Sequence, residues 1–118
     1  MILNVFERLL LRNIVPQIQG WNFGHMKEAR LLLEDMFTPQ EEENLQIKLK
    51  EDGKGVTWRV RDDEGNDIPQ VKDMDVSDGL KNKLAKFLKD LNRQEKLGFE
   101  HYSLYEKLVE PGEGEDGD

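Results

Sequence analysis

Hydrophobic side chains recur at helical spacing at the start of the chain. A first helix is expected to begin after Asn4, which stands three residues before Glu7 in the arrangement of a capping box. It should end near Asn13 and Pro16, because proline cannot continue the hydrogen-bond ladder of a helix. The residues expected on its apolar face are Val5, Phe6, Leu9, Leu10 and Ile14.

Two more helices are predicted before the pattern changes. The second should run from about Phe23 to Phe37, where hydrophobic residues recur on one helical face. Thr38, Pro39 and Glu41 then combine a capping residue, a proline at the first helical position and an acid at the third. This combination is typical of a short helix, here over about residues 39–44. The stripe of the second helix consists of Met26, Ala29, Leu33, Met36 and Phe37.

The hydrophobic pattern then changes from helical spacing to strict alternation. Two alternating runs flank the loop 51–55, which predicts a β-hairpin with one apolar face that packs on helices. A third strand is expected within residues 71–76. The apolar face of the hairpin should carry Leu45, Ile47, Leu49, Val56, Trp58 and Val60.

Two helices are predicted after the strands. The first should be capped by Ser77 or Asp78 and reach about Asn92, and the second should follow Gly98 over about residues 99–109. Because the strands are grouped in the middle of the chain, the order of elements indicates an α+β domain. We expect four to five helices packed on one face of a small antiparallel sheet, with two to three strands and a central β-hairpin.

Composition supports a single globular domain with a polar end. The 118 residues fit one domain over 1–110, and the sequence predicts a disordered acidic tail over 111–118. No stretch approaches the roughly 18–20 apolar residues of a membrane span, and no signal peptide is recognisable. We therefore expect a cytoplasmic protein that does not bind membranes. The net charge is −8, of which −4 comes from Glu113, Glu115, Asp116 and Asp118.

The sequence predicts no catalytic, cofactor-binding or metal-binding residue. Cysteine is absent, and His25 and His101 lie far apart without the spacing of metal ligands. Ser77 is explained by helix capping, and Ser103 lies in no nucleophile motif. The acidic loop 62–67 does not fit an EF-hand. We expect the hydrophobic side chains to hold the helices on the sheet without a buried polar cluster, while a small metal-dependent or serine hydrolase stays an alternative.

Binding to another protein is the leading hypothesis. The aromatic side chains most suited to an interface are Trp21, Phe23, Tyr102 and Tyr105. The partner would be another protein, or a second copy of the chain in a homodimer. The function expected is therefore that of a small, non-enzymatic accessory protein acting by protein–protein interaction.

The alternative is a winged-helix DNA-binding regulator, in which a basic face of the hairpin meets phosphates. The second predicted helix places Lys27 and Arg30 beside several acids, which argues against nucleic acid as a partner. The four cations of the predicted basic hairpin face are Lys48, Lys50, Arg59 and Arg61.

Both ends of the predicted domain resemble one group of proteins. The opening run from Asn4 to Leu11 with Ile14 to Pro16, and the closing run from Glu100 to Val109, resemble small uncharacterised proteins of phages and prophage-like regions. The resemblance spans most of the chain in layout, but the matching motifs are structural. It therefore implies a phage-type origin and no particular activity.

Overall fold

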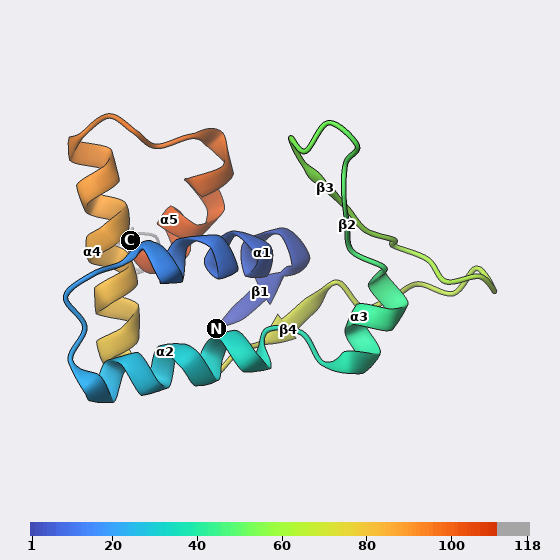
Figure 1. Cartoon of the computed structure of the whole chain (residues 1–118), viewed down its shortest axis with the longest axis horizontal. Helices are drawn as coiled ribbons and strands as arrows, with labels where there is room; N and C mark the ends of the chain where they lie inside the picture. The colour runs from blue at the N-terminus through green and yellow to red at the C-terminus, as the bar shows by residue number, and fades with distance from the viewer. Residues whose placement is uncertain (111–118) are drawn as a thin grey trace, which may run out of the picture.

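The computed structural model describes residues 1–110, and the predicted acidic tail at 111–118 lies outside the described residues. Five α-helices and two small antiparallel strand pairs confirm the α+β class (Figure 1). The elements are β1 (Ile2–Asn4), α1 (Val5–Ile14), the 3-10 turn η1 (Val15–Gln17), α2 (Phe23–Asp35), α3 (Pro39–Leu45), β2 (Lys48–Leu49), β3 (Val56–Thr57), β4 (Val71–Asp73), α4 (Asp78–Arg93), the 3-10 turn η2 (Phe99–His101) and α5 (Tyr102–Leu108).

Three helices begin at the capping residues that the sequence predicts. The side chain of Asn4 accepts a hydrogen bond from the Glu7 backbone at 2.7 Å, and Thr38 accepts one from Glu41 at 3.0 Å. Ser77 accepts the Leu80 backbone N–H at 3.2 Å at the start of α4. Each bond satisfies a backbone donor that the first helical turn leaves free, so these boundaries follow from local chemistry.

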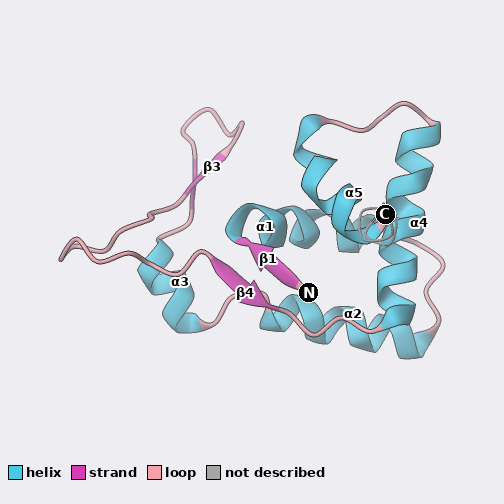
Figure 2. Cartoon of the chain, turned by 180° about the vertical axis from the view of Figure 1, so that it is seen from behind, coloured by secondary structure: helices cyan, strands magenta, loops and turns pink. Residues whose placement is uncertain are grey.

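The strands form two separate pairs, which Figure 2 shows apart from each other. The predicted hairpin is present, but only Lys48–Leu49 and Val56–Thr57 pair in it. The predicted third strand pairs with β1, with Leu3 opposite Lys72, and not with the hairpin. β1 has no recognisable signal in the sequence, because three residues are too short for an alternating pattern.

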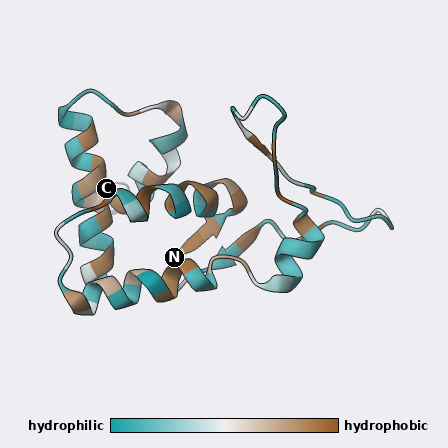
Figure 3. Ribbon diagram, in the orientation of Figure 1, coloured by the Kyte–Doolittle hydropathy of each residue, from teal (hydrophilic) through white to brown (hydrophobic). Residues whose placement is uncertain are grey.

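The hydrophobic core contains buried residues of β1, α1, α2, α4 and α5, and Figure 3 shows hydrophobic residues alternating with hydrophilic ones along the helices. Leu3, Leu84 and Leu104 are almost fully buried there. The hairpin contributes to this core only at its base, where Leu45 is buried and Trp58 is partly buried. None of the helices in residues 1–110 combines the length and apolar character needed to cross a membrane.

The buried face of α1 differs from the predicted one. Phe6, expected in the core, is 44% exposed, whereas the charged residues Glu7 and Arg8 are 1% and 0% exposed. The expectation that no polar cluster is buried is therefore wrong. A buried charge is costly unless it is paired and hydrogen-bonded, so the partners of both side chains explain why α1 is turned this way.

Arg8 ties α1 to the C-terminal end of α2, to α3 and to the start of β4. Its guanidinium donates hydrogen bonds to the Met36 carbonyl at 2.9 Å, the Glu41 carboxylate at 2.7 Å and the Gln70 carbonyl at 3.4 Å. It also lies over the Phe37 ring, 4.4 Å from the ring centre. These contacts replace the water that the cation loses on burial.

Glu7 ties α1 to the last helix. Its carboxylate accepts hydrogen bonds from Ser103 Oγ at 2.6 Å, from Lys107 Nζ at 2.7 Å and from the Asn4 backbone at 2.9 Å. Burial by itself would raise the pKa of Glu7. The hydrogen bonds from Lys107, Ser103 and Asn4, together with the Lys107 charge, outweigh burial and hold this pKa below its ordinary value of 4.5.

Replacing Arg8 with Met should destabilise the domain by about 3 kcal/mol, because Glu41 and the carbonyls of Met36 and Gln70 lose their donor. Urea unfolding followed by circular dichroism measures this change. The matched control is Arg30→Met, which breaks the exposed Arg30–Glu34 pair and should cost about 0.5 kcal/mol or less. Equal effects of the two substitutions would contradict a structural role for the buried cation.

Stability should fall on acidification, with Glu7 as one cause. A carboxyl whose pKa is lower in the folded state stabilises the fold above its unfolded pKa of 4.5, and this contribution is lost as the pH falls through 4.5 towards the folded pKa. Glu7→Gln should therefore flatten the acid limb of a plot of unfolding free energy against pH. Glu34→Gln, an exposed control, should leave that limb unchanged. An unchanged slope in Glu7→Gln would argue against this linkage.

Candidate functional site

A groove beside the last helix is the best candidate for a binding site. It has a volume of about 390 Å³ and is lined from the segment after α4, from η2 and from α5. Its walls combine aromatic and aliphatic side chains with carboxylates, and no Lys or Arg is among the described residues that line it. We define the α5 groove by Leu97, Phe99, Tyr102, Tyr105, Glu106 and Glu110.

The turn after α4 brings these residues together. Glu95 adopts a left-handed conformation with φ 56°, and the Lys96 backbone donates to the Leu91 carbonyl at 2.9 Å, which ends the helix. The Gly98 backbone then donates to Nδ1 of His101 at 2.9 Å, which starts η2. The chain consequently reverses and returns α5 alongside α4, as Figure 1 shows.

Two different faces of α5 are used in two different ways. Leu104 and Leu108 are buried against the core, which fixes the helix in place. Phe99, Tyr102 and Tyr105 recur at every third residue along η2 and α5 and line the groove. Phe99 is 97% exposed and Tyr102 is 65% exposed, so the fold of the single chain leaves both rings largely in water.

The groove has few groups that could perform chemistry. Nδ1 of His101 already accepts a hydrogen bond from the backbone N–H of Gly98. The hydroxyl of Ser103 donates a hydrogen bond to the carboxylate of Glu7. Ser77, the other serine of the described residues, also donates to a carboxylate, and neither serine lines the groove, so the groove itself offers no serine nucleophile. The exposed aromatic rings therefore suit binding better than catalysis.

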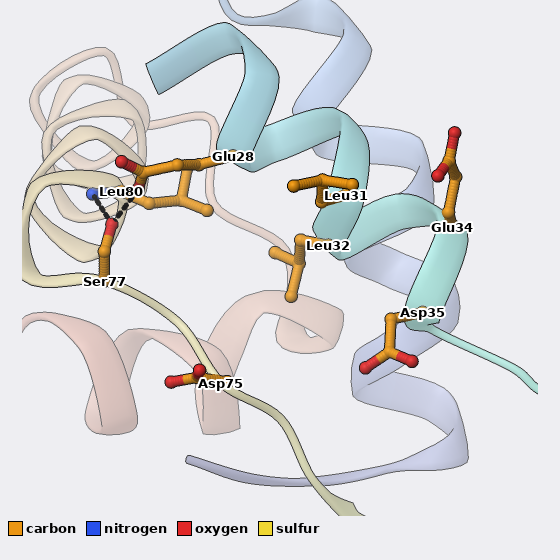
Figure 4. A pocket seen from close by; sticks show the side chains of 8 residues that line it. All are labelled: Glu28, Leu31, Leu32, Glu34, Asp35, Asp75, Ser77 and Leu80. Atoms are coloured by element: carbon orange, nitrogen blue, oxygen red, sulfur yellow. Dashed lines mark hydrogen bonds between the residues drawn. The ribbon is translucent and has the colours of Figure 1, made fainter. Parts of the chain in front are cut away.

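Another pocket lies between α2 and the segment that leads into α4 (Figure 4). Its volume is about 590 Å³, and Leu31, Leu32 and Leu80 line it together with four carboxylates. Figure 4 shows that these carboxylates do not converge. The four acids are Glu28, Glu34, Asp35 and Asp75.

Three of these four acids have partners inside the chain. Glu28 accepts the Ser77 hydroxyl, Glu34 pairs with Arg30, and Asp35 pairs with Lys72. No group of three or more His, Asp or Glu side chains within residues 1–110 is arranged to hold a metal ion. The acidic surface of this pocket is thus partly neutralised by neighbouring residues.

The two histidines and the acidic loop are used by the local structure. His25 lies 3.1 Å from the Asn22 amide, at the start of α2, and far along the chain from His101. Asp62 accepts the backbone N–H groups of Glu64 and Asn66 at 2.9 Å each, which stabilises the turn. These hydrogen bonds hold the pKa of Asp62 below its ordinary value of 3.8, and the bond from the Asn66 backbone has the largest effect.

The four aromatic residues singled out in the sequence fall into two places. Tyr102 and Tyr105 line the α5 groove. Trp21 is partly buried, donates its indole N–H to the Ile18 carbonyl at 2.9 Å and has Lys83 over its ring at 5.5 Å. Phe23, at the first turn of α2, is 74% exposed. The structure therefore brings only the two tyrosines into one site.

The four cations of the predicted basic hairpin face also fall into two groups, two arginines with partners and two exposed lysines. Arg59 donates to the Asn44 carbonyl at 3.0 and 3.1 Å and pairs with Asp63, and Arg61 pairs with Asp67. Lys48 and Lys50 are exposed, and the described part of the chain offers neither of them an ion pair. Only the two lysines are thus available to an anionic partner.

Sequence reasoning did not single out Phe99, Leu97, Glu106 or Glu110. A signal for them was present, since aromatic residues at 99, 102 and 105 repeat at a spacing of three while Leu104 and Leu108 form a second apolar stripe. Two apolar stripes on one short helix exceed what a single core contact needs. Such a pattern indicates a helix that offers one face to the core and another to a partner.

Comparison with known proteins gives this chain no relative: no family model, no curated protein and no solved structure matches it.

Proposed function

We propose that this chain is a non-enzymatic, cytoplasmic accessory protein that binds a segment of a partner protein in the α5 groove. The observation that carries the proposal is the exposure of Phe99 in η2 and of Tyr102 in α5, a helix whose other face is fixed in the core. Burying an aromatic side chain of this size contributes about 1.5–3 kcal/mol, so two exposed rings at one place form a strong anchor for a ligand.

The rim of the groove specifies what kind of segment fits. Glu106 and Glu110 line the groove, and Glu100 in η2 is exposed nearby in sequence. Carboxylates around an apolar surface favour a ligand that carries Lys or Arg beside an apolar side chain, and they repel phosphates. The partner segment proposed here is therefore apolar at its centre and basic at its flanks.

The rigid support of the groove favours the same function. Glu7 holds Ser103 and Lys107 on one side of α5, and Tyr105 accepts a hydrogen bond from the Asn92 amide at 3.3 Å. A binding surface on a fixed helix loses less conformational entropy on association than one on a free loop. The resemblance of both chain ends to small phage-type proteins stays a prediction about origin and adds no activity.

A DNA-binding regulator is supported less well. Arg59 and Arg61, which would contact phosphates, are paired with Asp63 and Asp67 of their own loop. The α2 helix carries both signs of charge, and Arg30 on it pairs with Glu34. Non-specific DNA affinity depends on free cations, so these pairs weaken the hypothesis.

Selection of peptides from a random display library should test the proposed site. We expect the selected peptides to share an apolar residue flanked by Lys or Arg. Their affinity, measured by fluorescence anisotropy, should fall about tenfold or more in the double variant Phe99→Ala/Tyr102→Ala. Because both rings are largely exposed, the thermal unfolding of this variant should remain close to that of the wild type.

The matched control is Phe23→Ala, which removes another exposed ring at 74% exposure, away from the groove. This control should bind the selected peptides as the wild type does. A library that yields no shared sequence, or peptides that bind the double variant as tightly as the wild type, would contradict the proposal.

A further inference from the structure

A projecting arm of the same chain matches the ligand that the α5 groove requires. The arm comprises residues 46–57, and Figures 1 and 2 show its hairpin beyond the N-terminal end of α1, separate from α5. It begins at Gln46, which ends α3 in a left-handed conformation with φ 48°. Backbone bonds from Lys50 to Gly55 at 2.8 Å and from Gly53 to Lys50 at 2.9 Å close its turn.

The apolar face of this arm is covered only at its base. The predicted alternation places Leu45, Ile47 and Leu49 on one side of the first strand. Leu45 is fully buried and Ile47 is partly buried, whereas Leu49 is 75% exposed. A two-stranded hairpin is marginally stable in water by itself, so covering Leu49 would stabilise the arm as well as form a contact.

Lysines flank Leu49 along the chain. Lys48, Lys50 and Lys54 are exposed, and no ion pair within residues 1–110 involves them. Glu51 and Asp52 are the acids of the arm, which leaves it with a net charge of +1 in a chain of −8. The arm thus brings an exposed apolar side chain and a locally positive surface, whereas the groove offers aromatic walls and a carboxylate rim.

We propose that the α5 groove receives the arm of a second copy of this chain, with Leu49 seated against Phe99 and Tyr102. This inference rests on the proposed function, because it assigns a partner to the same groove. A second copy is assigned because no residue of the arm lines the groove of its own chain within the described residues. Reciprocal insertion makes the contact twice across a two-fold axis, which closes the assembly as a dimer.

The pocket between α2 and α4 fits the arm less well. Glu34 and Asp35 on its rim are already paired with Arg30 and Lys72, so less negative charge remains for the lysines of an arm. Leu31, which lines this pocket, is 63% exposed and serves as a matched control.

Charge reversal gives a direct test of the contact. Size-exclusion chromatography with light scattering should show that the wild type dimerises increasingly as its concentration rises. Lys48→Glu/Lys50→Glu and Glu106→Lys/Glu110→Lys should each remain monomeric, because the arm and the groove then carry the same sign of charge. An equimolar mixture of the two variants should form dimers again, since each reversed arm meets a reversed groove and each native arm meets a native one.

Apolar substitutions test the anchor independently of charge. Leu49→Ser should abolish dimerisation with little effect on circular dichroism, because the side chain is 75% exposed. Phe99→Ala/Tyr102→Ala should do the same from the side of the groove. Leu31→Ser, the control in the pocket between α2 and α4, should dimerise as the wild type does.

The outcomes separate this inference from the proposed function. A wild type that is monomeric at every concentration, or a mixture of charge-reversed variants that stays monomeric, would overturn the arm as the ligand. If selected peptides still bind the groove in a Phe99-dependent way, the proposed function stands and a different protein is the partner. If no selected peptide binds the groove in a Phe99-dependent way either, both proposals are wrong.

Discussion

The fold depends on two neighbouring charges buried in the first helix. Glu7 and Arg8 are adjacent in sequence, and because successive residues of a helix point about 100° apart, they reach different parts of the chain. Glu7 accepts hydrogen bonds from Ser103 and Lys107, whereas Arg8 reaches Glu41 and two backbone carbonyls. Neither charge could be buried without these partners, so the ends and the middle of the chain must assemble around α1 together.

This constraint also positions both surfaces on which the proposals depend. Glu7 fixes one face of α5 through Ser103, while Tyr102 on this helix and Phe99 in η2 before it remain exposed. Arg8 fixes α3 through Glu41, and the arm begins where α3 ends at Leu45. One helix therefore determines where the groove lies and from which point the arm projects. The buried charges act on binding through placement, since neither of them lines the groove.

The sequence predicts the parts of this structure that depend on neighbouring residues. The caps at Asn4, Thr38 and Ser77 each involve a backbone group three residues away, so their pattern is visible in the sequence. The burial of Glu7 depends on Lys107, one hundred residues away, and the pairing of β1 with β4, with Leu3 opposite Lys72, also joins segments far apart in the sequence. Such contacts leave no periodic signal. For the same reason the two tyrosines of the groove could be named from the sequence, while their common site could not.

The net charge limits which partners can approach the groove. Two copies of a chain with a charge of −8 repel each other, and the chain would also repel any other acidic protein. This repulsion acts over the Debye length, which is about 8 Å at physiological salt. A ligand overcomes this repulsion only if it brings positive charge to the carboxylate rim, as Lys48 and Lys50 of the arm do. Added salt weakens both effects, since it screens the repulsion between whole chains and the attraction at the rim. The proposed apolar contact of Leu49 with the aromatic rings would not be screened, and it would therefore provide most of the affinity at high ionic strength.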